Sequence, residues 1–301
     1  MSTVDNAIPT GYHRHANGGG LVADTATVPD SVFIGDGAKI GDGAKIGDDA
    51  KIGDDATIGD GATIGYDATI GDGAKIGDDA KIGDDAKIGY DATIGDGATI
   101  GYDAKIGDDA TIGDDAKIGD RATIGDRAKI GDRAKIGDRA KIGYDATIGD
   151  GATIGDGATI GYDAKIGDDA TIDDAAFIED NVEIAPDLEI AAHAYVTDST
   201  GRNHAPVIPD IDRTILDAIN ESGQSLDMAT WHHACGTTHC RGGWAITLAG
   251  EAGAKLEQAM GSRGAARAIY AASSPGWPLP KFFATNEDAL ADMQMRAEAS
   301  R

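Results

Sequence analysis

Aliphatic residues recur at every sixth position through most of the chain. From Ile34 to Thr171 the unit Ile-Gly-[Asp/Tyr]-[Asp/Gly/Arg]-Ala-[Thr/Lys] runs 23 times without insertion or deletion. The aliphatic position continues on both sides of this run, so 30 positions lie in register from Val22 to Val196. A period of six fits neither the alternation of a flat strand nor the turn of about 3.6 residues in a helix. The pattern therefore indicates a solenoid of short repeated units.

Each unit combines a short strand with a turn. The alanine at the fifth position and the isoleucine two residues later lie on one face of a strand, and the threonine or lysine between them points outward. The glycine that follows adopts backbone angles that other residues resist, and aspartate side chains bond to their own backbone in turns. We expect an axial core of stacked isoleucines and alanines.

The hexad resembles the repeat of left-handed parallel β-helix proteins, the family of bacterial hexapeptide acyltransferases and γ-class carbonic anhydrases. This resemblance covers about residues 22–201 and implies a triangular prism with three hexads, about 18 residues, in each coil. It also implies the parallel trimer common in that family. The predicted fold class is mainly β: a left-handed parallel β-helix of about ten coils, followed by a small all-α domain.

Four segments are expected along the chain. Residues 1–20 predict a flexible N-terminal arm, residues 21–201 the β-solenoid, residues 202–209 a linker, and residues 210–301 the helical domain. In the last segment, apolar residues at helical spacing follow Asp210, and further helices are expected from Thr238, over 251–260, over 263–272 and from Thr285 to about Ala299. Gly261 is expected to separate the two middle helices.

Composition narrows the possible partners and the setting. The formal net charge is -26 and the pI is about 4.4, which disfavours nucleic acid and anionic membrane as partners. No apolar stretch reaches the roughly 18 to 20 residues of a membrane span, and the N-terminus has no signal-peptide pattern. The chain has only two cysteines, so no disulfide framework is expected. We expect a cytoplasmic or particle-associated protein.

The segment from Trp231 to Trp244 is the richest in reactive side chains. His232, His233, Cys235, His239 and Cys240 fall within nine residues, and mixed Cys/His sets bind zinc. We take His232, Cys235, His239 and Cys240 as the candidate metal ligands. A Cys240 nucleophile with a pKa lowered at a helix N-terminus is a second hypothesis. A packed loop with cysteine and tryptophan in the core, with or without a disulfide between the two cysteines, is the preferred interpretation.

The same segment carries a second resemblance. The stretch from Cys235 to Ala245, Cys-Gly-Thr-Thr-His-Cys-Arg-Gly-Gly-Trp-Ala, is followed by Gly276-Trp277-Pro278. It resembles a small uncharacterised helical domain of bacterial and phage proteins, and this resemblance implies no activity.

Charged residues form columns when the repeats are stacked. A carboxylate recurs on every coil at one corner, and stacked oxygen ligands suit calcium; solvated turn residues are the preferred interpretation. This column comprises Asp42, Asp60, Asp78, Asp96, Asp114, Asp132, Asp150 and Asp168. Four arginines at successive fourth positions form a belt, interpreted as relief of carboxylate repulsion rather than as a docking ring. They are Arg121, Arg127, Arg133 and Arg139.

Two aromatic residues mark a candidate interface. Phe177 and Tyr195 are 18 residues apart, so they share one outward column near the end of the solenoid. Neighbouring exposed rings indicate that another surface covers them. We expect either the C-terminal domain or a neighbouring subunit to do so.

Two functions are compatible with these features. The run from Ile34 to Thr171 contains no histidine or cysteine, which favours a structural scaffold that is not an enzyme. Such a scaffold presents the helical domain and assembles as a homo-oligomer, either a trimer or a filament, with an unknown protein partner. The alternative is an acyltransferase-like enzyme of the hexapeptide family. His193, in the last coil, is then the candidate base.

Overall fold

The computed structural model describes residues 8–221, 225–229 and 238–299. The chain divides into two compact units. The first comprises Met1–Ile190 and Asp198–Gly201, and the second comprises Ala191–Thr197 and Arg202–Arg301. Whether the predicted linker and helical segment fold as separate domains stays a prediction.

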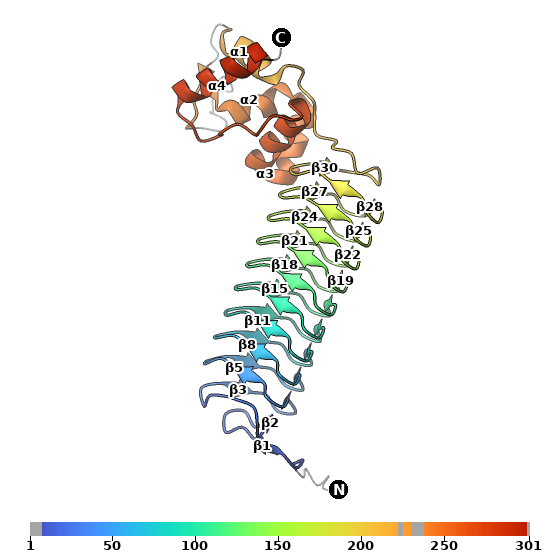
Figure 1. The fold of residues 1–301 in the computed structure, drawn as a ribbon. Coiled ribbons are helices and arrows are strands. Elements are labelled where there is room, and N and C mark those ends of the chain that lie inside the picture. The colour runs from blue at the N-terminus through green and yellow to red at the C-terminus, as the bar shows by residue number, and fades with distance from the viewer. Residues whose placement is uncertain (1–7, 222–224, 230–237, 300–301) are drawn as a thin grey trace. The chain divides into compact units, whose positions relative to one another are not determined.

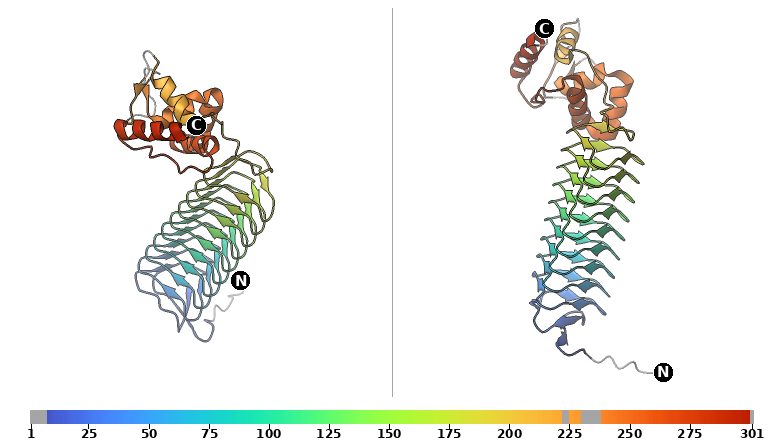
Figure 2. Two further views of the ribbon diagram at one scale, coloured as in Figure 1. Left: turned by 45° about the horizontal axis from the view of Figure 1, so that its top comes forward. Right: turned by 45° about the vertical axis from the view of Figure 1, so that its right-hand side comes forward.

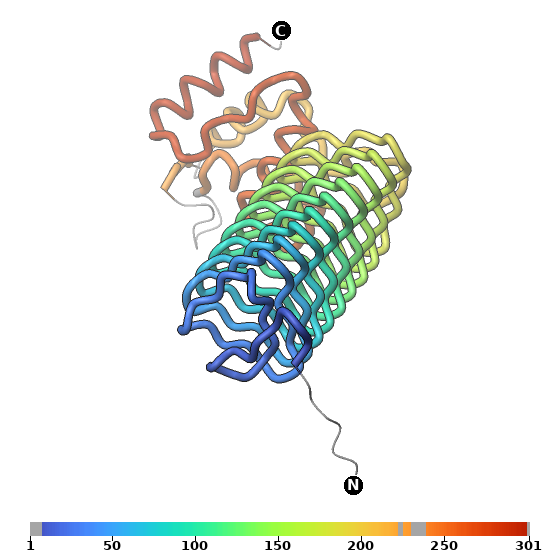
Figure 3. Tube along the Cα trace, turned by 60° about the horizontal axis from the view of Figure 1, so that its bottom comes forward, coloured from blue at the N-terminus to red at the C-terminus, as the bar shows by residue number. Residues whose placement is uncertain are grey.

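The first unit is a parallel β-solenoid of about ten coils, as predicted (Figure 1). Its strands pair in parallel with partners one coil away, as in Lys75↔Thr93 and Ile76↔Ile94. This register confirms the coil of 18 residues. Together with the hexapeptide repeat, it identifies the unit as a left-handed parallel β-helix. Figure 3, which brings the N-terminal end forward, shows the coils stacked along one axis.

Three sheets form the walls of this unit (Figure 2). The first sheet contains β1 (Tyr12–Arg14), β2 (Leu21–Ala23), β4 (Lys39–Ile40), β7 (Thr57–Ile58), β10 (Lys75–Ile76), β13 (Thr93–Ile94), β16 (Thr111–Ile112), β19 (Lys129–Ile130), β22 (Thr147–Ile148), β25 (Lys165–Ile166) and β28 (Glu183–Ile184). The second sheet contains β5 (Lys45–Ile46), β8 (Thr63–Ile64), β11 (Lys81–Ile82), β14 (Thr99–Ile100), β17 (Lys117–Ile118), β20 (Lys135–Ile136), β23 (Thr153–Ile154), β26 (Thr171–Ile172) and β29 (Glu189–Ile190). The third sheet contains β3 (Phe33–Ile34), β6 (Lys51–Ile52), β9 (Thr69–Ile70), β12 (Lys87–Ile88), β15 (Lys105–Ile106), β18 (Thr123–Ile124), β21 (Lys141–Ile142), β24 (Thr159–Ile160) and β27 (Phe177–Ile178).

The axis of the solenoid is filled as the sequence predicts. Every isoleucine of the hexad run is at most 4% exposed, and the alanine at the fifth position is fully buried throughout. The glycine at the second position is required by the spacing of the coils. A Cβ added to Gly113 would lie 2.6 Å from the backbone nitrogen of Asp132 in the next coil. Adjacent coils therefore stack closely only where this side chain is absent.

Aspartates at the third position connect successive coils. The Oδ1 atom of Asp132 accepts a hydrogen bond of 2.9 Å from the backbone N–H of Asp114, one coil earlier. The same bond recurs along the unit at 2.7 to 3.1 Å, for example from Asp42 to Asp60 and from Asp108 to Asp126. These carboxylates therefore have a structural partner in the turn. Calcium binding by the column stays a prediction.

Residues 8–20 precede the first coil and contain β1. This strand pairs antiparallel with β2, and His13 lies opposite Val22. Gly18 and Gly20 pass close to the backbone of Ile34 and Gly35, where a Cβ would collide. The sequence predicts a flexible arm here, and its mobility in solution stays a prediction.

The second unit begins with β30 (Tyr195–Val196) and continues with α1 (Ile211–Ile219), β31 (Ser225–Leu226), β32 (Thr238–His239), α2 (Arg241–Leu248), α3 (Gly250–Ser273) and α4 (Asn286–Ala299). Its core contains Ile215, Trp244, Ile269, Tyr270 and Met293. Gly261 interrupts α3 with a φ of 72°, as expected. Thr285 caps α4, because its Oγ1 accepts from the N–H of Asp288 at 3.1 Å.

Candidate functional site

The predicted metal ligands lie only partly within the described residues. His232 and Cys235 fall in the segment 230–237, outside them. His239 is buried and its ring meets Trp244 edge-on, with centroids 4.9 Å apart. Cys240 is 2% exposed. Among the described residues no three His, Cys, Asp or Glu side chains converge on a possible ion. Zinc binding by this set stays a prediction.

Cys240 occupies the N-cap of α2, with an environment different from the one expected for a nucleophile. Its Sγ accepts a hydrogen bond from the N–H of Gly243 at 3.3 Å. Burial raises the pKa of the Cys240 thiol, and the hydrogen bonds from Gly243 and Gly242 only partly oppose this. The sequence-based expectation of a lowered pKa is wrong, because desolvation of the thiolate outweighs the helix terminus.

The predicted interface aromatics are both partly buried. Tyr195 packs against the core of the second unit, in which it is itself included. Its backbone N–H donates to Asn203 at 3.1 Å and its carbonyl accepts from His204 at 2.7 Å. Phe177 belongs to the first unit. The role of the two rings at an interface stays a prediction.

A histidine and a carboxylate form a pair at the N-terminal end of the solenoid. His13 Nδ1 lies 3.0 Å from Asp24 Oδ1, and the two side chains are 54% and 61% exposed. The hairpin holds them together, because the N–H of Asp24 donates to the carbonyl of Gly11 at 2.8 Å. Neighbouring Lys39 places its Nζ 5.0 Å from the centre of the Tyr12 ring. An accessible imidazole hydrogen-bonded to a carboxylate has the chemistry that a general base needs.

His15 and His193 differ from His13 in their surroundings. His15 is buried, and its Nδ1 lies 3.2 Å from the carbonyl of Asn17. His193 occupies a corner position with a φ of 60° and is partly buried. His13 is therefore more accessible than either. Its exposure could not be predicted from the sequence, because the residues around it show no periodic pattern.

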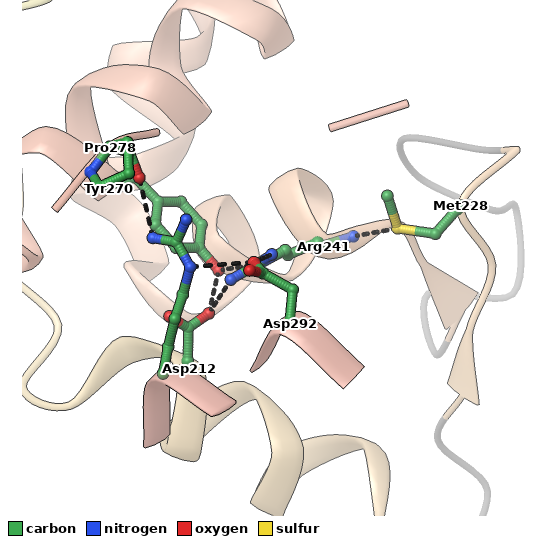
Figure 4. Close-up of polar contacts among 7 residues, drawn as sticks. Asp212, Met228, Arg241, Tyr270, Pro278 and Asp292 are labelled. Carbon is green, nitrogen blue, oxygen red and sulfur yellow. Dashed lines mark hydrogen bonds and ion pairs between the residues drawn. The ribbon is translucent and has the colours of Figure 1, made fainter. Parts of the chain in front are cut away.

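A buried polar network joins the four helices of the second unit (Figure 4). Arg241 of α2 is 1% exposed, and its two terminal nitrogens each lie 2.5 Å from a carboxylate oxygen, one of Asp212 and one of Asp292. Its Nε donates to the Tyr270 hydroxyl at 2.9 Å. That hydroxyl donates to Asp212 at 3.0 Å. Arg296 completes the network with a 2.9 Å contact to Asp292.

The electrostatics of this network suit a fixed structural role. Burial alone lowers the pKa of the Arg241 guanidinium, but its interactions with Tyr270, Asp212 and Asp292 outweigh this effect and raise that pKa. Burial raises the pKa of the Tyr270 hydroxyl well above its ordinary value. Both groups therefore keep their protons at neutral pH. Sequence reasoning missed the network because the residues that contact one another from different helices are 29 to 58 residues apart.

Two surface pockets flank this network. The larger, of about 560 Å³, is lined by Arg241, Lys281, Asp288, Asp292 and Arg296 among others. The smaller, of about 330 Å³, includes Asp212, Ser273, Trp277 and Arg296. Each pocket is lined by both acidic and basic side chains, most of which form ion pairs. Neither pocket therefore favours an anionic or a cationic ligand.

Comparison with known proteins identifies the repeats. The family model for bacterial transferase hexapeptide (six repeats) matches residues 31–66, 73–104, 91–126, 103–133 and 127–162. These residues carry the repeat of that hexapeptide family. Among the described residues, no helix is both long and apolar enough to cross a membrane.

Solved structures similar to this hexapeptide-repeat chain include acyltransferases. The UDP-N-acetylglucosamine acyltransferase LpxA from Bacteroides fragilis is 20% identical, with a TM-score of 0.44, over 67% of this chain and 88% of that one. The enzyme from Moraxella catarrhalis is 19% identical, with a TM-score of 0.34, over 67% and 85%. The Arabidopsis enzyme is 14% identical, with a TM-score of 0.34, over 86% and 97%. No curated protein matches the chain.

The expectation of a structural, filament-forming scaffold without enzymatic activity is contradicted. The family model that matches the repeats is that of a bacterial transferase. The expectation was wrong because the absence of histidine between Ile34 and Thr171 does not extend to the ends of the coil stack. His13 and His193 lie outside that run, one at each end.

Proposed function

We propose that this protein is an acyltransferase of the hexapeptide-repeat type. The observation that carries the proposal is the match of the transferase hexapeptide family to residues 31–66 and 73–162 of the solenoid. The acyl donor is proposed to be a thioester, and the acceptor a hydroxyl or amino group. We further propose the parallel homotrimer that the repeat resemblance implies.

His13 is the proposed general base. When its Nδ1–H is donated to the Asp24 carboxylate, 3.0 Å away, Nε2 is left to accept a proton. Nε2 removes the proton of the acceptor as its oxygen or nitrogen forms a bond to the thioester carbonyl carbon. The carbon–sulfur bond then breaks, and the proton passes to the departing thiolate. Asp24 holds the ring and stabilises the imidazolium that forms during the reaction.

Thiol release provides the test. The purified full-length chain is incubated with acetyl- and longer acyl-coenzyme A thioesters and a panel of amino and hydroxy sugars, and free thiol is measured. We expect acceptor-dependent release, reduced about 10² to 10⁴-fold in His13→Gln. Asp24→Asn should lower the rate less than His13→Gln, because the base itself remains. Absence of acceptor-dependent release with every donor would contradict the proposal.

His193→Gln is the matched control for the identity of the base. It changes the other candidate histidine of the coils in the same way, so it should leave thiol release within about twofold of the parent value. If His193→Gln abolishes release and His13→Gln does not, the base is assigned wrongly. Light scattering tests the trimer separately, since a monomer at every concentration would contradict it.

A further inference from the structure

Three cationic side chains gather at one pocket of the second unit, in a protein whose net charge is -26. Arg263 and Arg267 lie one turn apart on α3, and Lys281 follows in the loop before α4. The pocket measures about 380 Å³, and its remaining lining is apolar: Leu279, Pro280, Phe282 and Phe283.

These cations lack the carboxylates that neutralise other basic residues of the unit. Within the described residues, none of Arg263, Arg267 and Lys281 forms an ion pair, whereas Arg241, Arg296, Arg213 and Lys255 each do. The Nε atom of Arg267 is buried and has no hydrogen-bond partner among the described residues. A buried N–H donor without an acceptor destabilises the folded protein, and a ligand that supplies an acceptor atom would remove this cost.

The electrostatic environment agrees with this geometry. Burial lowers the pKa of the Arg267 guanidinium, and repulsion from Arg263 lowers it further. An anion placed between the two guanidiniums would relieve both effects. Arginine pairs recognise phosphate in particular, because their planar N–H groups match its oxygens.

An aromatic ring lies at the edge of the same pocket. Phe283 is 72% exposed, and the Arg263 guanidinium lies 5.6 Å from the centre of its ring. A large exposed ring beside a phosphate-binding group is suited to stacking a planar base, as in proteins that bind nucleotides. The acidity of the whole chain disfavours long polyanions, which leaves a small ligand.

We propose that the pocket formed by Arg263, Arg267, Lys281 and Phe283 binds a nucleoside phosphate. The guanidiniums and Lys281 contact the phosphate groups, Arg267 Nε donates to one of their oxygens, and Phe283 stacks on the base. This binding does not depend on the proposed transferase activity.

Calorimetric titration of the full-length chain tests the site, with ADP, inorganic pyrophosphate and adenosine as separate probes. ADP should bind about tenfold more tightly than pyrophosphate, and adenosine should bind least. Arg267→Met should weaken ADP and pyrophosphate alike, by about tenfold or more. Phe283→Leu should weaken ADP about tenfold and leave pyrophosphate unchanged.

Lys255→Met is the matched control, because it removes one cation from the same helix at a position paired with Glu251 at 3.0 Å. It should leave ADP affinity within about twofold of the parent value. Circular dichroism verifies that each variant is folded, and Arg263→Met replaces Arg267→Met if the latter unfolds. No binding of ADP or pyrophosphate at about 1 mM, or equal losses in Arg267→Met and Lys255→Met, would overturn the site. Equal affinities for ADP and pyrophosphate, or tighter binding of an oligonucleotide, would overturn its assignment to a small nucleotide.

Discussion

The solenoid and the helical unit are held together by different kinds of contact. In the solenoid, the same few contacts recur in each coil: a buried isoleucine, a buried alanine and a turn hydrogen bond to an aspartate. In the helical unit, one network centred on Arg241 connects all four helices. The destabilising effect of a single substitution should therefore stay within neighbouring coils in the first unit and reach all four helices in the second.

The largest effect is expected for Arg241→Met in the helical unit. The substitution removes the guanidinium that Asp212 and Asp292 each contact at 2.5 Å. Asp292 keeps a second guanidinium, that of Arg296 at 2.9 Å, whereas Asp212 keeps the Tyr270 hydroxyl. Loss of one partner from a buried ion pair costs about 3 to 5 kcal/mol. Differential scanning calorimetry should show a lower midpoint for the helical transition and an unchanged solenoid transition.

The double variant Arg241→Met/Asp212→Asn sharpens this test. It also removes the charge of Asp212, the more deeply buried of the two carboxylates. We expect it to recover part of the lost free energy of unfolding. A parent-like midpoint in Arg241→Met would show that the network does not hold the helices together.

The next effect is expected for Ile112→Ala in the middle of the solenoid. Ile112 is 1% exposed and lies between Ile94 and Ile130 of the adjacent coils. Truncation of a buried isoleucine costs about 2 to 5 kcal/mol. Calorimetry should show a lower solenoid midpoint alone, with Thr111→Ser on the same strand as the surface control. A shift of the helical transition by the same amount would contradict the independence of the two regions.

A smaller effect is expected for Asp132→Ala. The Ala variant removes the oxygen that accepts the N–H of Asp114 at 2.9 Å, whereas Asp132→Asn keeps an oxygen acceptor there. Loss of one such hydrogen bond costs about 0.5 to 1.5 kcal/mol. Urea denaturation should therefore rank the parent, Asn and Ala variants in that order of decreasing stability. Equal losses in both variants would mean that charge, and not the hydrogen bond, is the relevant property of this position.

The two regions also differ in how far their sequence predicts them. The period of six predicted a solenoid, and the 18-residue coil that the hexapeptide resemblance implies gives the register of Lys75 with Thr93. The helices were predictable from apolar spacing and from Gly261 and Thr285. The Arg241 network was not, because its residues come from separate helices and meet only after packing. Likewise, no spacing rule brings Lys281 beside Arg263 and Arg267, or His13 beside Asp24.

The smallest effect is expected for substitution of Arg127 in the arginine belt, where the solenoid contains an ion pair. Arg127 contacts Asp145 through two hydrogen bonds, from Nε at 2.7 Å and from Nη2 at 2.6 Å. The hydrogen bond from Arg127 lowers the pKa of the Asp145 carboxyl, and the guanidinium charge adds to this effect. A carboxyl whose pKa is lower in the folded state stabilises that state above its unfolded pKa. The contribution is lost as the pH falls through the folded pKa.

Carboxyl-carbon NMR titration should show Asp145 ionising below its ordinary range in the parent protein. In Arg127→Gln its pKa should return toward the ordinary value, with little change in the solenoid midpoint, because exposed pairs are screened by solvent and salt. Arg133→Gln removes a belt arginine that forms no ion pair within the described residues, so it should leave the Asp145 titration unchanged. If instead Arg127→Gln lowers the midpoint as far as Ile112→Ala does, the belt is a determinant of solenoid stability and the contrast between the two regions is weaker than proposed.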